Sequence, residues 1–130
     1  MTIPFICILA ALVLIFVPRG FVAAAQAKQP EGLDLRNPRA QQARLTGLGA
    51  RAQAAHQNSF EGFALFAAAV FVAHLAGADP GWSSILACGY VASRAAYIAF
   101  YLGDIPAARS AVWILGVAMI LGLFLLKWIA

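Results

Sequence analysis

The chain has 130 residues, of which 63% are hydrophobic and 11% charged, and its formal net charge is +4. Soluble domains average roughly 45–50% apolar and about 25% charged residues. A soluble domain of this length has too little interior to bury the apolar excess. The composition therefore excludes an ordinary soluble protein and predicts that lipid covers much of the surface. The positive charge fits loops beside an anionic membrane leaflet, so it requires no nucleic-acid partner.

Four apolar runs are long enough, with their flanking residues, to cross the hydrocarbon core, which takes about 20 helical residues. Only helices and closed barrels satisfy their backbone in lipid, and the alternation typical of membrane strands is absent. We therefore predict an all-α membrane protein, a four-transmembrane-helix bundle that forms a single domain over residues 1–130. The expected helices cover residues 2–25, 47–77, 82–102 and 106–129, with a polar loop over 26–46.

The first run has a second interpretation as a cleaved signal peptide. Residues 23–27, which read AAAQA, resemble a small-residue cleavage site. The residues before the run carry no positive side chain, and the apolar stretch is long for a signal peptide. These two features favour a permanent membrane helix.

Lysine and arginine are unevenly distributed among the three connections. The second connection has neither, and Arg109 directly follows the third. The first connection and the start of the second helix carry five, with Arg19 at the edge: Lys28, Arg36, Arg39, Arg44 and Arg51. By the positive-inside rule, the first and third connections are expected to be cytoplasmic and both termini to lie on the other side.

Polar residues inside the apolar runs are the first candidates for function, because lipid makes them costly unless they are partnered. Cys7 and Cys88 are an exception, since they are expected to be small buried hydrophobic residues with neither a disulfide framework nor a metal site. On the second helix, Arg51, Asn58 and Glu61 share one face near its cytoplasmic end. This stripe predicts either a site for a small zwitterionic ligand or a hydrogen-bonded cluster that stabilises the bundle.

The third helix carries a second stripe, because Arg94, Tyr97 and Tyr101 are spaced i, i+3 and i+7. An arginine in the middle of a membrane run needs an anionic partner. Glu61 is the single acidic residue within the apolar runs, so we expect a Glu61–Arg94 ion pair. Tyr101, at the helix end, is equally consistent with an interfacial aromatic residue of the membrane belt.

The fourth helix is expected to begin at Pro106, which places Arg109 in its first turn. A helix N-terminus together with an arginine attracts carboxylates, phosphates or thiolates. The alternative is an ordinary positive-inside anchor. On the same helix, Gly116 and Gly122 are expected to be packing positions between helices.

Two motifs in order resemble a known family. Residues 51–66 contain A-H-x-N-x-x-E, formed by Ala55, His56, Asn58 and Glu61. Residues 94–110 contain an arginine, tyrosines three and seven positions later, and an Arg-Ser pair at the start of the fourth helix. With Asn-Pro-Arg at 37–39, the chain resembles the family of membrane-associated proteins in eicosanoid and glutathione metabolism (MAPEG), and within it an uncharacterised bacterial branch.

The resemblance implies a homotrimer in a bacterial inner membrane, with both termini periplasmic and a glutathione site between subunits near the cytoplasmic face. Its implied function is a glutathione-dependent transferase or peroxidase without a metal, in which a thiolate attacks a lipophilic electrophile arriving from the bilayer. By position, the catalytic residues are Tyr101 and Arg109. The residues implied to hold glutathione are Arg51, Asn58, Glu61, Arg94 and Tyr97.

One position departs from the family pattern. The arginine that commonly precedes the Ala-His pair is replaced by Ala54, and Arg51, one turn earlier on a similar face, is the expected substitute. The alternative function is a non-catalytic membrane protein whose polar stripes bind lipid or stabilise the oligomer.

Overall fold

The computed structural model describes residues 1–129 and consists of helices joined by short turns and one longer connection. The helices are α1 (Ile3–Ala27), α2 (Pro38–Ala43), α3 (Gly47–Leu75), α4 (Pro80–Leu102) and α5 (Pro106–Ile129). All except α2 are long and apolar enough to cross a membrane, which gives four candidate spans in the described residues. The predicted four-helix membrane fold is confirmed, and the chain is an integral multi-pass membrane protein.

Local sequence signals fix most helix ends. Prolines occupy the first positions of α2, α4 and α5, where the missing N–H costs nothing. Asp79 caps α4, since its side chain accepts a hydrogen bond of 2.8 Å from the backbone N–H of Trp82. Gly77 adopts φ +68° just after α3, so α3 ends at Leu75, two residues before its expected end.

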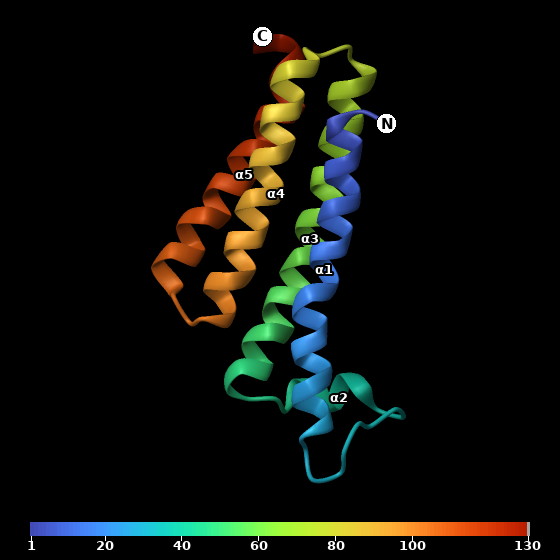
Figure 1. The fold of residues 1–130 in the computed structure, drawn as a ribbon, viewed down its shortest axis with the longest axis vertical. Helices are drawn as coiled ribbons and strands as arrows, with labels where there is room; N and C mark the ends of the chain where they lie inside the picture. The colour runs from blue at the N-terminus through green and yellow to red at the C-terminus, as the bar shows by residue number, and fades with distance from the viewer. Residues whose placement is uncertain (130) are drawn as a thin grey trace.

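The four long helices lie side by side along the long axis of the molecule (Figure 1). Both termini and the α3–α4 turn lie at one end, which we call the terminal end. The connection over residues 28–46, which includes α2, and the α4–α5 turn over residues 103–105 lie toward the other end, which we call the polar end. The two polar stripes predicted from sequence therefore share the same half of the bundle.

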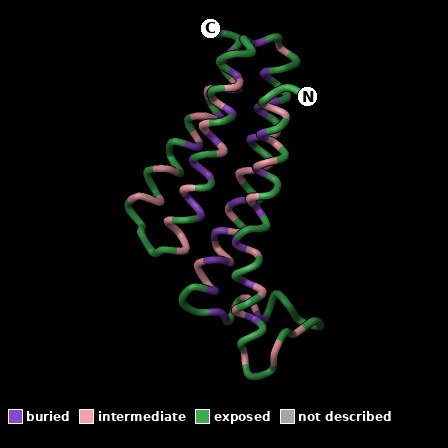
Figure 2. The backbone as a smooth tube through the Cα atoms, in the orientation of Figure 1, coloured by how far each residue is buried: buried purple, intermediate pink, exposed green. Residues whose placement is uncertain are grey.

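Close packing joins the helices around a core in which Phe66 of α3 stacks on Tyr90 of α4, with ring centroids 4.0 Å apart. Gly116 lets α5 approach α4, because a Cβ there would lie 2.9 Å from the Ser93 hydroxyl oxygen. The predicted packing role of the glycine is confirmed. Figure 2 shows buried positions along the inner faces of the helices and exposed ones outward, as expected where lipid is the solvent.

The first helix packs along its length against α3 and α4. Pro18 lies inside α1 and cannot donate a backbone hydrogen bond to the preceding turn. His56 of α3 joins the same region, since its Nδ1 lies 2.8 Å from the carbonyl oxygen of Ile15. A carbonyl only accepts, so Nδ1 carries the proton in this contact. The histidine of the A-H-x-N-x-x-E motif thus ties α3 to α1.

Residues 28–46, expected to be a polar loop, fold around the buried side chain of Gln41 on α2. Its amide donates to the carbonyl of Gly32 at 2.6 Å and accepts from Gln26 at 2.9 Å and from the backbone N–H of Asp34 at 3.1 Å. The connection is therefore held by the hydrogen bonds of Gln41 together with the apolar packing of Leu45 against Val22 and Ala52.

Candidate functional site

Arg94 is the centre of the polar residues inside the bundle and is 6% exposed. Its guanidinium donates to the amide oxygen of Asn58 at 3.0 Å and to the hydroxyl of Ser59 at 3.4 Å. It also lies over the ring of Tyr97, 4.1 Å from the centroid, which is within cation–π range. Neighbouring turns of α3 and α4 thus place an arginine, an amide and an aromatic face in one contact.

The predicted Glu61–Arg94 ion pair is wrong for the described residues. Within residues 1–129, Arg94 forms no ion pair, because Asn58, Ser59 and Tyr97 occupy its polar and aromatic contacts. Glu61 lies one turn beyond Asn58 and is exposed. The two charged side chains nevertheless line one cavity of about 130 Å³. The Glu61 carboxylate therefore lines the same cavity as Arg94 but does not form an ion pair with it.

The tyrosines of α4 connect this arginine to the start of α5. The rings of Tyr97 and Tyr101 meet edge to face with centroids 5.5 Å apart, and the Arg109 guanidinium lies 4.4 Å from the centroid of Tyr101. Asn58 and Trp113 complete the wall of a second, larger cavity of about 400 Å³ over these side chains. The motif on α4 and the Arg-Ser pair on α5 are thus brought together.

Two residues of α3 lie where three cavities meet. Asn58 lines both cavities on the α4–α5 side. Glu61 lines the smaller of these and also a third cavity of about 620 Å³ on the α1–α2 side, with Arg19 and Arg39 in its wall. We call the residues on the α4–α5 side the polar cluster: Asn58, Glu61, Arg94, Tyr97, Tyr101 and Arg109.

Arg51 lies apart from the polar cluster and lines none of the three cavities. Its guanidinium donates to the carbonyl of Leu102 at 3.4 Å and lies 3.8 Å from the carboxylate of Asp104. These contacts tie the start of α3 to the α4–α5 turn. The Arg51 side chain is thus engaged by the α4–α5 turn, and its predicted role in holding the ligand stays a prediction.

Several residues at the site were missed by sequence reasoning. Ser59 was not predicted because it lies beside the Asn58–Glu61 stripe rather than on it, although its hydroxyl accepts a hydrogen bond from Arg94. Trp113 follows Arg109 by four residues, a helical spacing that signals a shared face. The Gln53 side-chain oxygen lies in the wall of the α1–α2 cavity and is buried without a hydrogen-bond partner among residues 1–129. No sequence signal marked it.

The charges of the polar cluster are unpaired within residues 1–129. Arg94 and Arg109 have no carboxylate partner there, and Glu61 has no cationic partner. Glutathione carries two carboxylates, one ammonium group and a thiol, so two cations and one carboxylate are a complementary set. The asparagine amide and the tyrosine hydroxyls add groups that can both donate and accept hydrogen bonds. The residues present therefore fit this tripeptide chemically.

Comparison with known proteins agrees with these motifs. No match was found among curated proteins or among solved structures. The sequence profile of the MAPEG family matches residues 3–127, which cover both motifs and the four long helices except the last two residues of α5. The chain therefore belongs to the MAPEG family, whose members are glutathione-dependent membrane enzymes.

Proposed function

We propose that the chain is a glutathione-dependent transferase or peroxidase of a bacterial inner membrane that acts on lipophilic electrophiles. The observation that carries the proposal is the unpaired charge of the polar cluster. Arg94 is buried and Arg109 is half-buried, and both lack a carboxylate partner within residues 1–129. An intramembrane charge with neutral partners only is costly, so a bound anion stabilises the arrangement.

In this proposal, Asn58, Glu61, Arg94 and Tyr97 hold the tripeptide. A glutathione carboxylate accepts hydrogen bonds from Arg94, whose orientation is fixed by Asn58 and by the face of Tyr97. The exposed carboxylate of Glu61 accepts from the ammonium group. Charge-assisted bonds of this kind are roughly twice as strong as neutral ones, which favours a charged tripeptide over a neutral lipid in the cavity.

Arg109 and Tyr101 carry the chemistry. The positive charge of Arg109 lowers the pKa of the glutathione thiol, the thiol proton passes to water at the polar end, and the Tyr101 hydroxyl donates a hydrogen bond to the thiolate. In transfer, the sulfur forms a bond to an electrophilic carbon and the leaving group departs with its electron pair. In the peroxidase reaction, two glutathiones reduce a lipid hydroperoxide to alcohol and water and become glutathione disulfide.

We place the site between subunits of a homotrimer, near the cytoplasmic face. Glu61 supports this placement, because it is exposed in the single subunit and borders cavities on both sides of α3. The positive side chains of the 28–46 connection support a cytoplasmic polar end. Arg19 and Arg39 line the α1–α2 cavity, so a neighbouring subunit could supply from there the cation that is absent at Ala54.

A second function is favoured by one contact. Arg94 bonds Asn58 and Ser59 directly, as in a non-catalytic membrane protein whose polar cluster stabilises the bundle and binds a lipid headgroup. This function predicts that variants of Arg94 unfold the protein, and it predicts no saturable glutathione binding.

Equilibrium binding of labelled glutathione to the detergent-purified protein distinguishes the two functions. We expect saturable binding that is lost in Glu61→Gln and weakened, but not lost, in Arg109→Ala, with the oligomer size unchanged. Arg44→Ala is the matched control, because Arg44 is an exposed arginine whose partner Glu31 lies in the 28–46 connection. Absence of binding by the unaltered protein at millimolar glutathione refutes the enzyme proposal and leaves the lipid-binding function.

A further inference from the structure

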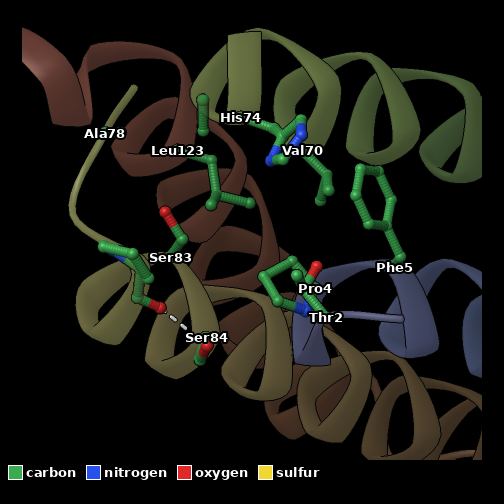
Figure 3. A pocket seen from close by; sticks show the side chains of 11 residues that line it. Thr2, Pro4, Phe5, Val70, His74, Ala78, Ser83, Ser84 and Leu123 are labelled. Atoms are coloured by element: carbon green, nitrogen blue, oxygen red, sulfur yellow. Dashed lines mark hydrogen bonds between the residues drawn. The ribbon is translucent and has the colours of Figure 1, made fainter. Parts of the chain in front are cut away.

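A fourth cavity, of about 170 Å³, lies at the terminal end of the bundle, away from the polar cluster. It is enclosed by α1, α3, α4 and α5, and Figure 3 shows its lining side chains converging from these helices. Phe5, Val70 and Leu123 form apolar walls, and the exposed residues Thr2 and His74 also line the cavity. The cavity is therefore largely apolar, with a few polar side chains in its wall.

Two serines of α4 line this cavity but differ in their hydrogen bonds. Ser84 donates to the carbonyl of Pro80 at 2.7 Å, so its hydroxyl is already engaged. Ser83 is 7% exposed, and its hydroxyl forms no hydrogen bond with any residue of the described chain 1–129. The Gln53 oxygen is the one fully buried side-chain atom of residues 1–129 that lacks a partner, so the Ser83 hydroxyl is not sealed inside the protein. It lines the cavity and is free to bond a ligand there.

The size of the cavity limits the ligand to about one ring. In another protein, a dry apolar cavity of about 150 Å³ holds one benzene molecule. Drug-sized ligands fill pockets of about 300–1,000 Å³, so they are too large. The walls favour an aromatic or short aliphatic body, since Phe5 meets the His74 ring edge to face with centroids 5.0 Å apart.

The surroundings indicate an amphiphilic ligand from the membrane interface. Trp82, in the first turn of α4, is 54% exposed, and exposed tryptophans are enriched where hydrocarbon meets water. Small aromatic alcohols partition to this same depth. We propose that the cavity is a binding site for a neutral, single-ring molecule with one hydroxyl group, such as a phenol, whose hydroxyl bonds Ser83. This site is independent of the polar cluster and does not rest on glutathione chemistry.

Competitive photolabelling of the full chain in lipid nanodiscs tests the proposal. The probe is a phenol that carries a photoreactive diazirine, and the labelled peptides are identified by mass spectrometry. Unlabelled phenol and toluene compete at equal membrane concentrations, because toluene has the same shape without the hydroxyl. In the unaltered protein, we expect saturable labelling of peptides that contain cavity residues. Phenol should compete roughly two- to ten-fold better than toluene, the value of one net hydrogen bond.

The serine variants give matched outcomes. Ser83→Ala should abolish the preference for phenol, whereas Ser84→Ala should keep it, because the Ser84 hydroxyl already bonds the backbone. Ala73 of α3 lies in the cavity wall. Ala73→Leu replaces its methyl group with a larger side chain that fills the cavity, so it should abolish saturable labelling without removing any polar group. The proposal is overturned if labelling is unsaturable, if phenol and toluene compete equally in the unaltered protein, or if both alanine variants lose the preference alike.

Discussion

Replacement of Arg109 by methionine should raise the pKa of bound glutathione while leaving the fold intact. A free thiol has a pKa of about 8.5, and an opposite charge within about 4–6 Å lowers a pKa by roughly 1–3 units. Arg109 is half-buried, so we take the middle of this range and assume that it lowers the thiol pKa by about 2 units. At about pH 7, the thiolate fraction is then about 76% with the arginine and about 3% without it, a roughly 25-fold loss of nucleophile. The lost cation–π contact with Tyr101 costs only about 0.5–1 kcal/mol.

The thiolate absorbs in the ultraviolet, so a pH titration of the glutathione complex measures this pKa directly. We expect Arg109→Met to move the midpoint upward by about 2 units and Arg109→Lys, which keeps the charge, to move it less. Arg44→Met is the control and should leave the midpoint unchanged, because Arg44 pairs with Glu31 outside the polar cluster. An unchanged midpoint in Arg109→Met, with glutathione still bound, refutes the catalytic role of this arginine.

Three further predictions concern the rest of the chain. Diamide takes two electrons and two protons from a pair of thiols. It should cross-link Cys7 to Cys88 within one subunit, because their sulfurs lie 3.7 Å apart. Mass spectrometry of the linked peptides checks this, and links between subunits contradict it. Gln41→Leu should leave buried polar partners unsatisfied at a cost of about 1–3 kcal/mol, seen as faster proteolysis of residues 28–46 than in the unaltered protein. The pKa of the Glu31 carboxyl is lowered by its own backbone N–H and by Arg44. The contact therefore stabilises the fold fully above the ordinary pKa of glutamate and is lost as pH falls through the lowered pKa. In Arg44→Gln, an NMR titration should show the Glu31 midpoint rising part of the way back to the ordinary value.

The fold was predictable because each level of the sequence pointed to the same answer. Hydropathy gave the four membrane helices, and prolines and Gly77 set their ends. Spacing alone placed Arg94, Tyr97 and Tyr101 on one face, and the structure joins them through the two contacts Arg94–Tyr97 and Tyr97–Tyr101. Periodicity is a property of one helix, so it survives any arrangement of its neighbours.

Contacts between helices were harder to predict, because they depend on how far each helix rotates and slides against the next. Cys7 and Cys88 are 81 residues apart and touch through α1–α4 packing that no local pattern reveals. His56 points away from the ligand stripe as its helical position indicates, but its bond to the Ile15 carbonyl depends on the register between α1 and α3. Arg51 shows the same limit, since Asp104 lies in a turn after the next helix.

The missing Glu61–Arg94 ion pair is the difference that bears most on function. A direct ion pair between Glu61 and Arg94 would neutralise both charges. The cavity that they line would then attract a charged ligand only weakly. Instead, Arg94 donates its hydrogen bonds to the neutral side chains of Asn58 and Ser59, and Glu61 stays exposed at the cavity wall. Both charges remain available, with opposite signs, on the two sides of one opening. A zwitterionic peptide matches that arrangement better than a lipid headgroup with a single phosphate does. If Glu61 only stabilised the fold, Glu61→Gln should lower stability and glutathione affinity together; for a ligand contact, affinity should fall while the unfolding midpoint stays in place.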